Sequence, residues 1–159
     1  MSGIAYLHLN PEKLMTNIDY VIYAEDDEDD RAMLAESFRK YIADKTLVTM
    51  PNGMALLHYL HENRAQKNLP CMIILDQNMP LMNGGEVIAA LKIDSALQNI
   101  PVVLFTTTSP EIPIFGEHGI PVVLKPDSFI EWDRMAEMLL SRYSPASPVA
   151  LPEGKSPKM

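Results

Sequence analysis

The sequence predicts an α/β fold in which helices pack on both faces of a parallel β-sheet. Two observations support this prediction. Five short apolar runs lack the alternation of a half-exposed strand, which is typical of strands buried on both faces. Segments with apolar residues at helical spacing separate these runs. Because strands and helices alternate along the chain, we expect right-handed crossovers around a single sheet.

The expected elements follow in order along the chain. Strands are expected at 20–24, 47–50, 71–75, 101–105 and 120–124. Helices are expected at 29–42, 53–64, 85–93 and 127–143. A further helix between the last two strands would contain Pro113, which costs about 3 kcal/mol inside a helix, so this helix 4 is expected to be short or irregular. Five such units predict a flavodoxin-like, doubly wound, five-stranded parallel sheet with strand order 2-1-3-4-5.

The domain organisation is expected to be simple. A chain of 159 residues is long enough for one ordinary domain, which we place at 18–143. Residues 1–17 form an N-terminal extension for which the pattern predicts no definite structure. Residues 144–159 contain four prolines and no apolar period, so we interpret them as a disordered tail.

The composition argues against several classes of protein. The net charge of −8 argues against direct nucleic-acid binding, which needs a basic surface. The single cysteine, Cys71, cannot form an internal disulfide, which favours a reducing compartment. No apolar run approaches the roughly 18 residues that a membrane-spanning helix needs. We therefore expect a soluble, cytoplasmic protein that does not insert into membranes.

Polar residues follow four of the five expected strands. In chain order they are Glu25, Asp26, Asp76, Thr106, Thr107 and Lys125. In doubly wound sheets the carboxyl ends of the strands lie at one edge, and ligands bind there. The remaining acidic residues of the first group, Asp27 to Asp30, are interpreted as capping and charging the start of a helix.

Three carboxylates at this edge indicate a metal site. Two carboxylates about 4 Å apart repel by roughly 4 kcal/mol at an effective dielectric constant near 20. A hard divalent cation removes this repulsion, and oxygen ligands suit Mg²⁺. With Mg²⁺ bound, such a site can accept a phosphoryl group, with Asp76 as the nucleophile. Lys125 would pair with the phosphoryl charge, and the Thr106 hydroxyl would donate a hydrogen bond to it.

Four segments resemble the motifs of one known family. They are YAEDDEDDR at 23–31, DQNMPLMNGGEV at 76–87, VVLFTT at 102–107 and VVLKP at 122–126. Together they resemble the receiver domain of two-component response regulators, over about residues 19–143. The chain looks like the stand-alone, chemotaxis-regulator-like type. This resemblance implies a signalling switch in a phosphorelay that catalyses its own phosphorylation and is not a turnover enzyme.

The resemblance also implies a complete phosphorylation site. Asp76 would accept a phosphoryl group from a histidine kinase or a histidine phosphotransfer protein. The implied ligands of Mg²⁺ are Glu25, Asp26, Asp76 and the backbone carbonyl of Asn78. Thr107 and Asn78 would support the phosphoryl group, and the Lys125–Pro126 peptide bond would be cis against a base rate of about 5–6%. Output would pass through protein–protein contacts to an unknown downstream protein, from a monomer or weak dimer.

Two departures from the family pattern concern the output surface. Val122 stands where the family often has an aromatic residue, and the span from Thr106 to Lys125 is about one helical turn shorter than usual. A degenerate receiver that acts as a phosphorylation-independent binding module is therefore the alternative. His58 and His61 are three positions apart on an expected helix, but without a nearby partner ligand we interpret them as exposed helix residues.

Two other classes that share this chemistry or fold are disfavoured. A haloacid-dehalogenase-like phosphatase would need its nucleophile after the first strand with a second Asp two residues later, whereas Asn78 is two residues after Asp76. A flavodoxin that binds FMN would need a phosphate-binding loop after the first strand, where Glu25 and Asp26 would repel the phosphate.

Overall fold

The computed structural model describes residues 20–42, 46–66, 68–107 and 119–143 of the chain. It forms a five-stranded parallel sheet with the order β2-β1-β3-β4-β5. The strands are β1 (Val21–Ala24), β2 (Leu47–Met50), β3 (Met72–Asp76), β4 (Val102–Thr106) and β5 (Val122–Leu124). The described helices are α2 (Glu28–Arg39), α3 (Gly53–Arg64), α4 (Gly84–Lys92) and α6 (Phe129–Tyr143). The predicted fold class and strand order are confirmed.

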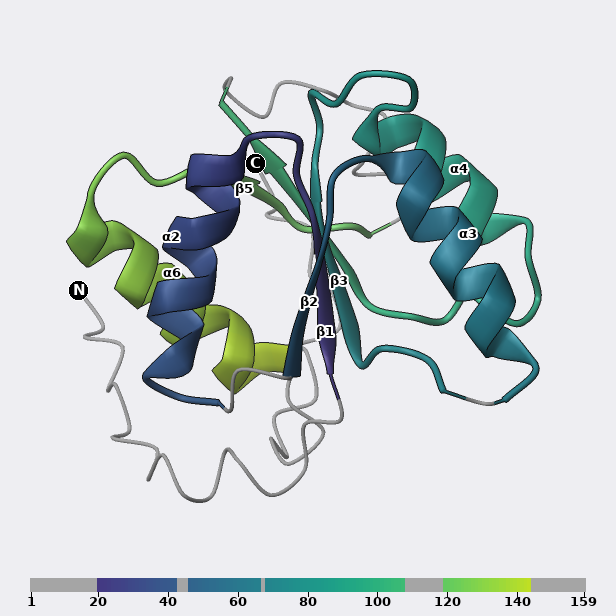
Figure 1. Ribbon diagram of the computed structural model, residues 1–159, viewed down its shortest axis with the longest axis horizontal. Helices are drawn as coiled ribbons and strands as arrows, with labels where there is room; N and C mark the ends of the chain where they lie inside the picture. The colour runs from purple at the N-terminus through teal and green to yellow at the C-terminus, as the bar shows by residue number, and fades with distance from the viewer. Residues whose placement is uncertain (1–19, 43–45, 67, 108–118, 144–159) are drawn as a thin grey trace, which may run out of the picture.

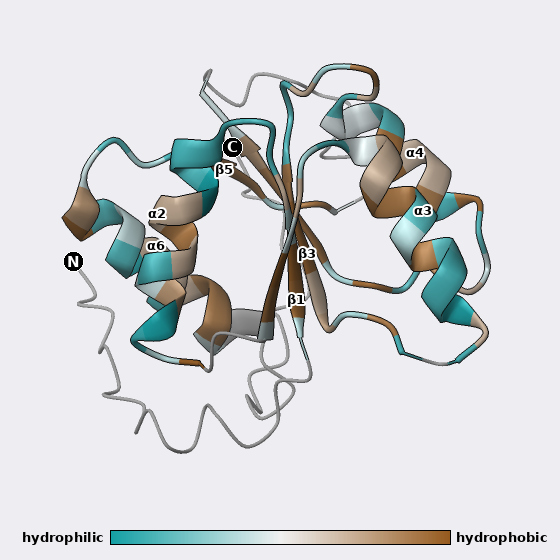
Figure 2. Ribbon diagram, viewed as in Figure 1, coloured by the Kyte–Doolittle hydropathy of each residue, from teal (hydrophilic) through white to brown (hydrophobic). Residues whose placement is uncertain are grey.

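The helices form two layers with the sheet between them. Helices α2 and α6 cover one face, and α3 and α4 cover the other (Figure 1). Hydrophobic residues are concentrated in the strands and on the helix sides that face them (Figure 2). Among the described residues no helix combines the length and the apolar character needed to cross a membrane. Three predictions fall on residues that the structure does not describe. They are the extension at 1–17, the tail at 144–159 and most of the segment between β4 and β5, where a short or irregular helix was expected.

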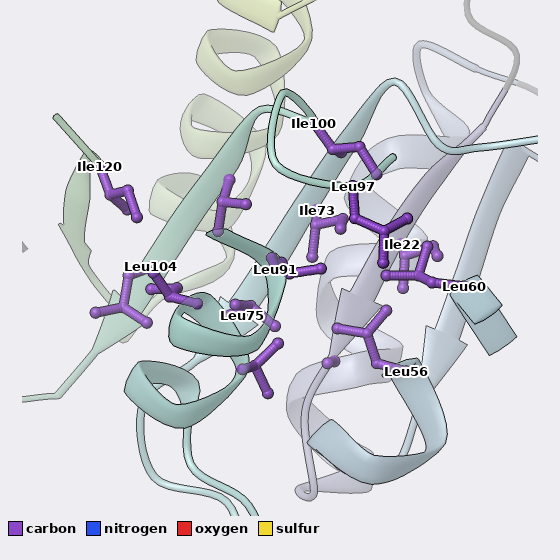
Figure 3. Packing of buried hydrophobic residues seen from close by; sticks show 14 of the residues in the cluster. Ile22, Leu56, Leu60, Ile73, Leu75, Leu91, Leu97, Ile100, Leu104 and Ile120 are labelled. Carbon is purple, nitrogen blue, oxygen red and sulfur yellow. The ribbon is translucent and has the colours of Figure 1, made fainter. Parts of the chain in front are cut away.

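Each face of the sheet has its own hydrophobic cluster because side chains along a strand alternate between faces. On β1, Val21 and Tyr23 belong to the cluster under α2 and α6. Ile22 and Ala24 belong to the cluster under α3 and α4, which Figure 3 shows from close by. Every residue of β1 is buried, which explains why its sequence is apolar without alternation.

The polar helix starts lie at the carboxyl edge of the sheet. Asp27 caps α2 as predicted, because its side chain accepts hydrogen bonds from the backbone N–H groups of Asp29 and Asp30. Asn83 and Glu86 form a capping box at the start of α4. A Cβ atom on Gly84 would lie 2.8 Å from the carbonyl oxygen of Asp76, so this position requires glycine. The loop after β3 can therefore pack tightly against the strand end.

Candidate functional site

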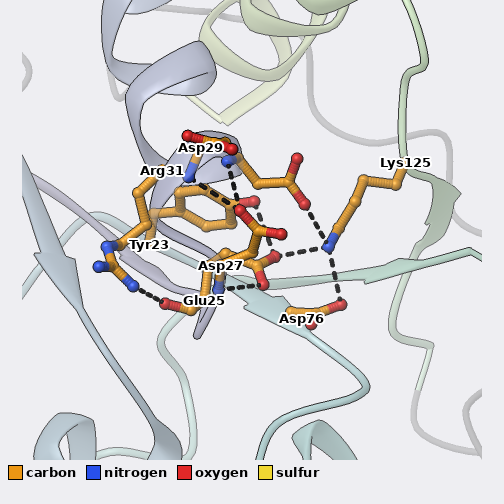
Figure 4. Close-up of polar contacts among 8 residues, drawn as sticks. Tyr23, Glu25, Asp27, Asp29, Arg31, Asp76 and Lys125 are labelled. Carbon is orange, nitrogen blue, oxygen red and sulfur yellow. Dashed lines mark hydrogen bonds and ion pairs between the residues drawn. The ribbon is translucent and has the colours of Figure 1, made fainter.

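Three of the predicted site residues, Glu25, Asp76 and Lys125, meet at the carboxyl edge of the sheet, as Figure 4 shows. Asp76 is the last residue of β3, and Glu25 follows β1, whose Ala24 pairs with Leu75. Lys125 follows β5, and its backbone N–H donates to the carbonyl of Thr106 over 2.8 Å. Glu25 is fully buried and Asp76 is 2% exposed. Strand order alone thus brings groups that are 49 to 100 residues apart in sequence into contact.

The ammonium group of Lys125 is shared by three carboxylates. Its Nζ atom lies 2.7 Å from Oε2 of Glu25, 2.8 Å from Oδ2 of Asp30 and 3.4 Å from Oδ1 of Asp76. An ammonium has three donor hydrogens, which is enough for one contact to each acid. Asp30 lies on the first turn of α2 and was expected only to charge the helix start. The structure corrects this expectation, because Asp30 also binds Lys125.

The Glu25 carboxylate is fixed by further hydrogen bonds. The Tyr23 hydroxyl donates to Oε2 over 3.1 Å, and the Asp27 backbone N–H donates to Oε1 over 3.1 Å. The backbone of Glu25 is held too, because its N–H donates to Met50 and its carbonyl accepts from the Arg31 guanidinium. Burial, followed by the nearby Glu25 charge, raises the pKa of Tyr23, so this hydroxyl remains a donor.

The carboxylates of Glu25, Asp26 and Asp76 are close enough to bind one cation together. One oxygen from each lies within 4.8 Å of the others, and Asp26 is exposed where the other two are buried. Among the described residues, Oδ1 of Asp76 is buried without a hydrogen-bond partner, although Lys125 is within ion-pair distance of it. An orphaned buried carboxylate oxygen beside two further oxygen donors fits a hard divalent cation.

The electrostatics of the site support the same interpretation. Burial raises the pKa of Glu25 to about 7, although hydrogen bonds from Lys125 and from the Asp27 backbone act against this. Burial likewise raises the pKa of Asp76, against the effect of Lys125. Burial alone would lower the pKa of Lys125, but its hydrogen bonds to Asp30 and Glu25 outweigh burial and raise it. Lys125 supplies one positive charge to the carboxylates of three acids, so a bound cation would add positive charge that the described side chains in contact with it do not supply.

The other predicted site residues lie near the same edge. Thr106 is buried at the end of β4, whereas Thr107 and Asn78 are exposed in the loops that follow β4 and β3. Their roles toward a phosphoryl group remain predictions. No cis peptide bond occurs among the described residues, so the prediction of a cis Lys125–Pro126 bond is wrong for this structure. The trans isomer is the intrinsically preferred one, and Lys125 reaches the carboxylates with it.

Sequence reasoning missed two residues of the site, Tyr23 and Asp30. Tyr23 was interpreted as part of a buried strand, but it stands two positions before Glu25, and residues two apart point to the same face of a strand. That spacing was an available signal. Nothing in the sequence distinguishes Asp30 from Asp29, since only the position of β5 relative to α2 makes one of them a partner of Lys125.

The fold and the site together define a receiver-type signalling domain of the α/β class. The chain belongs to the response regulator receiver domain family, because the profile of that family matches residues 21–116. Members of this family act in two-component signal transduction, where they interact with histidine kinases or phosphotransfer proteins. The match includes β1 to β4 and the acidic cluster, and β5 with Lys125 lies beyond it.

Relatives and solved structures agree with this assignment. The response regulator Rcp1 of Synechocystis sp. is 29% identical over 115 residues, which are 71% of this chain and 74% of Rcp1. The crystal structure of the Mn²⁺-bound form of Rcp1 has a TM-score of 0.67 at 26% identity and covers 84% of this chain and 99% of its own. The crystal structure of the phosphorylated cyanobacterial phytochrome response regulator RcpA has a TM-score of 0.68 at 26% identity. The match covers 78% of this chain and 93% of the RcpA chain.

Proposed function

We propose that this chain is a phosphorylation-dependent signalling switch that accepts a phosphoryl group on Asp76 with Mg²⁺ bound. One observation carries the proposal. The carboxylates of Glu25, Asp26 and Asp76 can share one cation at the edge of a receiver-family sheet. Two of them, Glu25 and Asp76, also contact the ammonium of Lys125. The Mn²⁺-bound state of Rcp1 and the phosphorylated state of RcpA support it by similarity.

Asp76 is the nucleophile of the proposed reaction. A carboxylate oxygen attacks the phosphorus atom of a phosphohistidine on a kinase or phosphotransfer protein, a P–O bond forms, and the P–N bond breaks with its electron pair returning to the imidazole. Bound Mg²⁺ would neutralise the neighbouring acids and the phosphoryl oxygens. Burial keeps Asp76 poorly solvated, which makes its charge readily available for bonding.

Lys125 and Thr106 stabilise the product in this proposal. The Lys125 ammonium is already 3.4 Å from Asp76, so it can pair with the charge that arrives with the phosphoryl group. Thr106 ends the neighbouring strand and would donate its hydroxyl to a phosphoryl oxygen. Signal output then requires a protein that distinguishes the two states of this edge.

The proposal is tested with acetyl phosphate, a small donor that needs no partner protein. Wild type incubated with acetyl phosphate and Mg²⁺ is expected to shift on a phosphate-affinity gel, and Asp76→Asn is expected to lose the shift completely. Asp133→Asn, which makes the same change on α6 away from the site, is the matched control and should shift like wild type. A wild type that does not shift with any divalent cation would favour the phosphorylation-independent binding module.

A further inference from the structure

Among the described residues that contact Glu25 through a side chain, Tyr23 belongs to a hydrophobic cluster of the core. It is fully buried, and its ring packs edge-on against Phe105 with centroids 5.7 Å apart. Phe105 in turn packs against Trp132 of α6. The ring of Tyr23 is therefore held between the sheet and the helix layer, and its hydroxyl points toward Glu25 (Figure 4).

Tyr23 and Lys125 both donate to the Glu25 carboxylate, but they differ in how many other groups they contact. Lys125 also contacts Oε2 of Glu25, but its ammonium is shared with Asp30 and Asp76 and is required by the phosphoryl group under the proposed function. The Tyr23 hydroxyl comes from a rigid, packed ring and donates to Glu25. The hydrogen bond from Tyr23 to Oε2 is separate from these ion pairs.

We propose that Tyr23 is a positioning residue that orients the Glu25 carboxylate for the divalent cation. The Asp27 backbone N–H fixes Oε1 and the Tyr23 hydroxyl fixes Oε2, so the two donors together set the plane of the carboxylate. This inference rests on the proposed function, because it assigns a role toward the cation which that function requires. Hydrogen bonds to a metal-binding group from outside the coordination shell typically contribute 10–100-fold to metal affinity.

The test compares Tyr23→Phe with wild type in the full-length chain. Mn²⁺ and Mg²⁺ are titrated separately by isothermal calorimetry, and Tyr23→Phe is expected to raise the Kd for each ion by roughly tenfold. The variant keeps the ring and its contact with Phe105, so it removes only the hydroxyl. With the metal at saturation, phosphorylation by acetyl phosphate should approach the wild-type rate, because only metal binding is weakened.

Tyr20→Phe is the matched control. Tyr20 is also buried, and it directly precedes the first residue of β1. Its hydroxyl donates to the backbone carbonyl of Asn68 over 2.7 Å and not to a carboxylate. Its loss should leave both Kd values within twofold of wild type. Thermal unfolding of both variants in a chelator reports their effect on the fold without metal.

The outcomes separate this inference from the proposed function. Wild-type Kd values for Tyr23→Phe would overturn the positioning role and leave the proposed function intact. An equal loss of affinity in Tyr20→Phe, or a Tyr23→Phe chain that is unfolded where Tyr20→Phe is folded, would show a structural role instead. A wild type that binds neither ion would overturn both proposals.

Discussion

Two lysine–aspartate pairs join helix α2 to the C-terminal part of the chain, one at each end of the helix. At the first turn, Asp30 binds Lys125, whose side chain is 10% exposed. At the far end, Lys40 follows the last turn of α2 and binds Asp133 of α6, with side chains 54% and 31% exposed. Both pairs consist of a lysine and an aspartate, although α2 supplies the aspartate in the first pair and the lysine comes from its end in the second. The main difference between the pairs is therefore their exposure to solvent.

The difference teaches that burial and crowding of charge make the first pair part of a site. Around Lys125, burial is the largest influence on the acids, and the pKa of Glu25 is raised. Around Lys40, the hydrogen bond from the lysine is the largest influence, and the pKa of Asp133 is lowered. An exposed pair contributes little to the free energy of unfolding, whereas breaking a buried pair leaves a charge without compensation.

The largest effect is expected from removing the largely buried Lys125. Lys125→Met leaves Glu25 and Asp76 buried without their cation, and should lower the free energy of unfolding by about 3 kcal/mol in metal-free buffer. Urea denaturation followed by circular dichroism measures this. Lys92→Met is the matched control, because Lys92 donates to the neutral carbonyl of Gln98 and should change stability much less. If both variants lost the same free energy of unfolding, the carboxylates around Lys125 would not explain the effect of its removal.

The second effect concerns pH, and the two ends of α2 should respond in opposite directions. The pKa of Glu25 is raised from 4.5 to about 7, so between these values the folded protein binds more protons than the unfolded chain. Stability from this group is present at low pH and is lost as pH rises through that window. Asp133 has a lowered pKa, and its stabilisation is lost as pH falls below its ordinary range.

Glu25→Gln isolates the first of these contributions. Urea unfolding in a chelator at a series of pH values gives the free energy of unfolding for wild type and variant. Between pH 4.5 and about 7, wild type should lose stability relative to Glu25→Gln, because the amide has no charge to bury. A constant difference across this window would mean that Glu25 titrates as it does in the unfolded chain.

The sequence was a good guide to the sheet because its strands are buried on both faces. Each expected strand overlaps an observed one, and β2 has the expected bounds. The helix at 53–64 also has its expected bounds, whereas the end of α2 was harder to place. The apolar period predicted a helix to residue 42, but α2 ends at Arg39, and the N–H groups of Tyr41 and Ile42 both donate to the Phe38 carbonyl in a turn. Ile42 remains in the core, so its burial extended the pattern beyond the helix.

The site was predictable as far as strand ends determine it. Glu25, Asp76 and Lys125 follow from one rule about the carboxyl edge of a doubly wound sheet. Tyr23 could have been found from its spacing of two residues before Glu25. Asp30 depends on the position of β5 relative to α2, which the linear sequence does not specify. The same reasoning explains why the exposed Lys40–Asp133 pair, which joins α2 to α6, could not be anticipated.

The smallest effect is expected from that exposed pair. Lys40→Met makes the same substitution as Lys125→Met, but both partners remain solvated when the contact is lost, so the free energy of unfolding should stay within the error of a urea titration. Salt screens charges on this surface, so any small loss of stability should be greatest at low ionic strength and should shrink at moderate ionic strength. If Lys40→Met instead destabilised the protein as much as Lys125→Met, the exposed α2–α6 contact would contribute as much to stability as the contacts of Lys125. Stability would then no longer distinguish the exposed pair from the shared ammonium at the carboxyl edge.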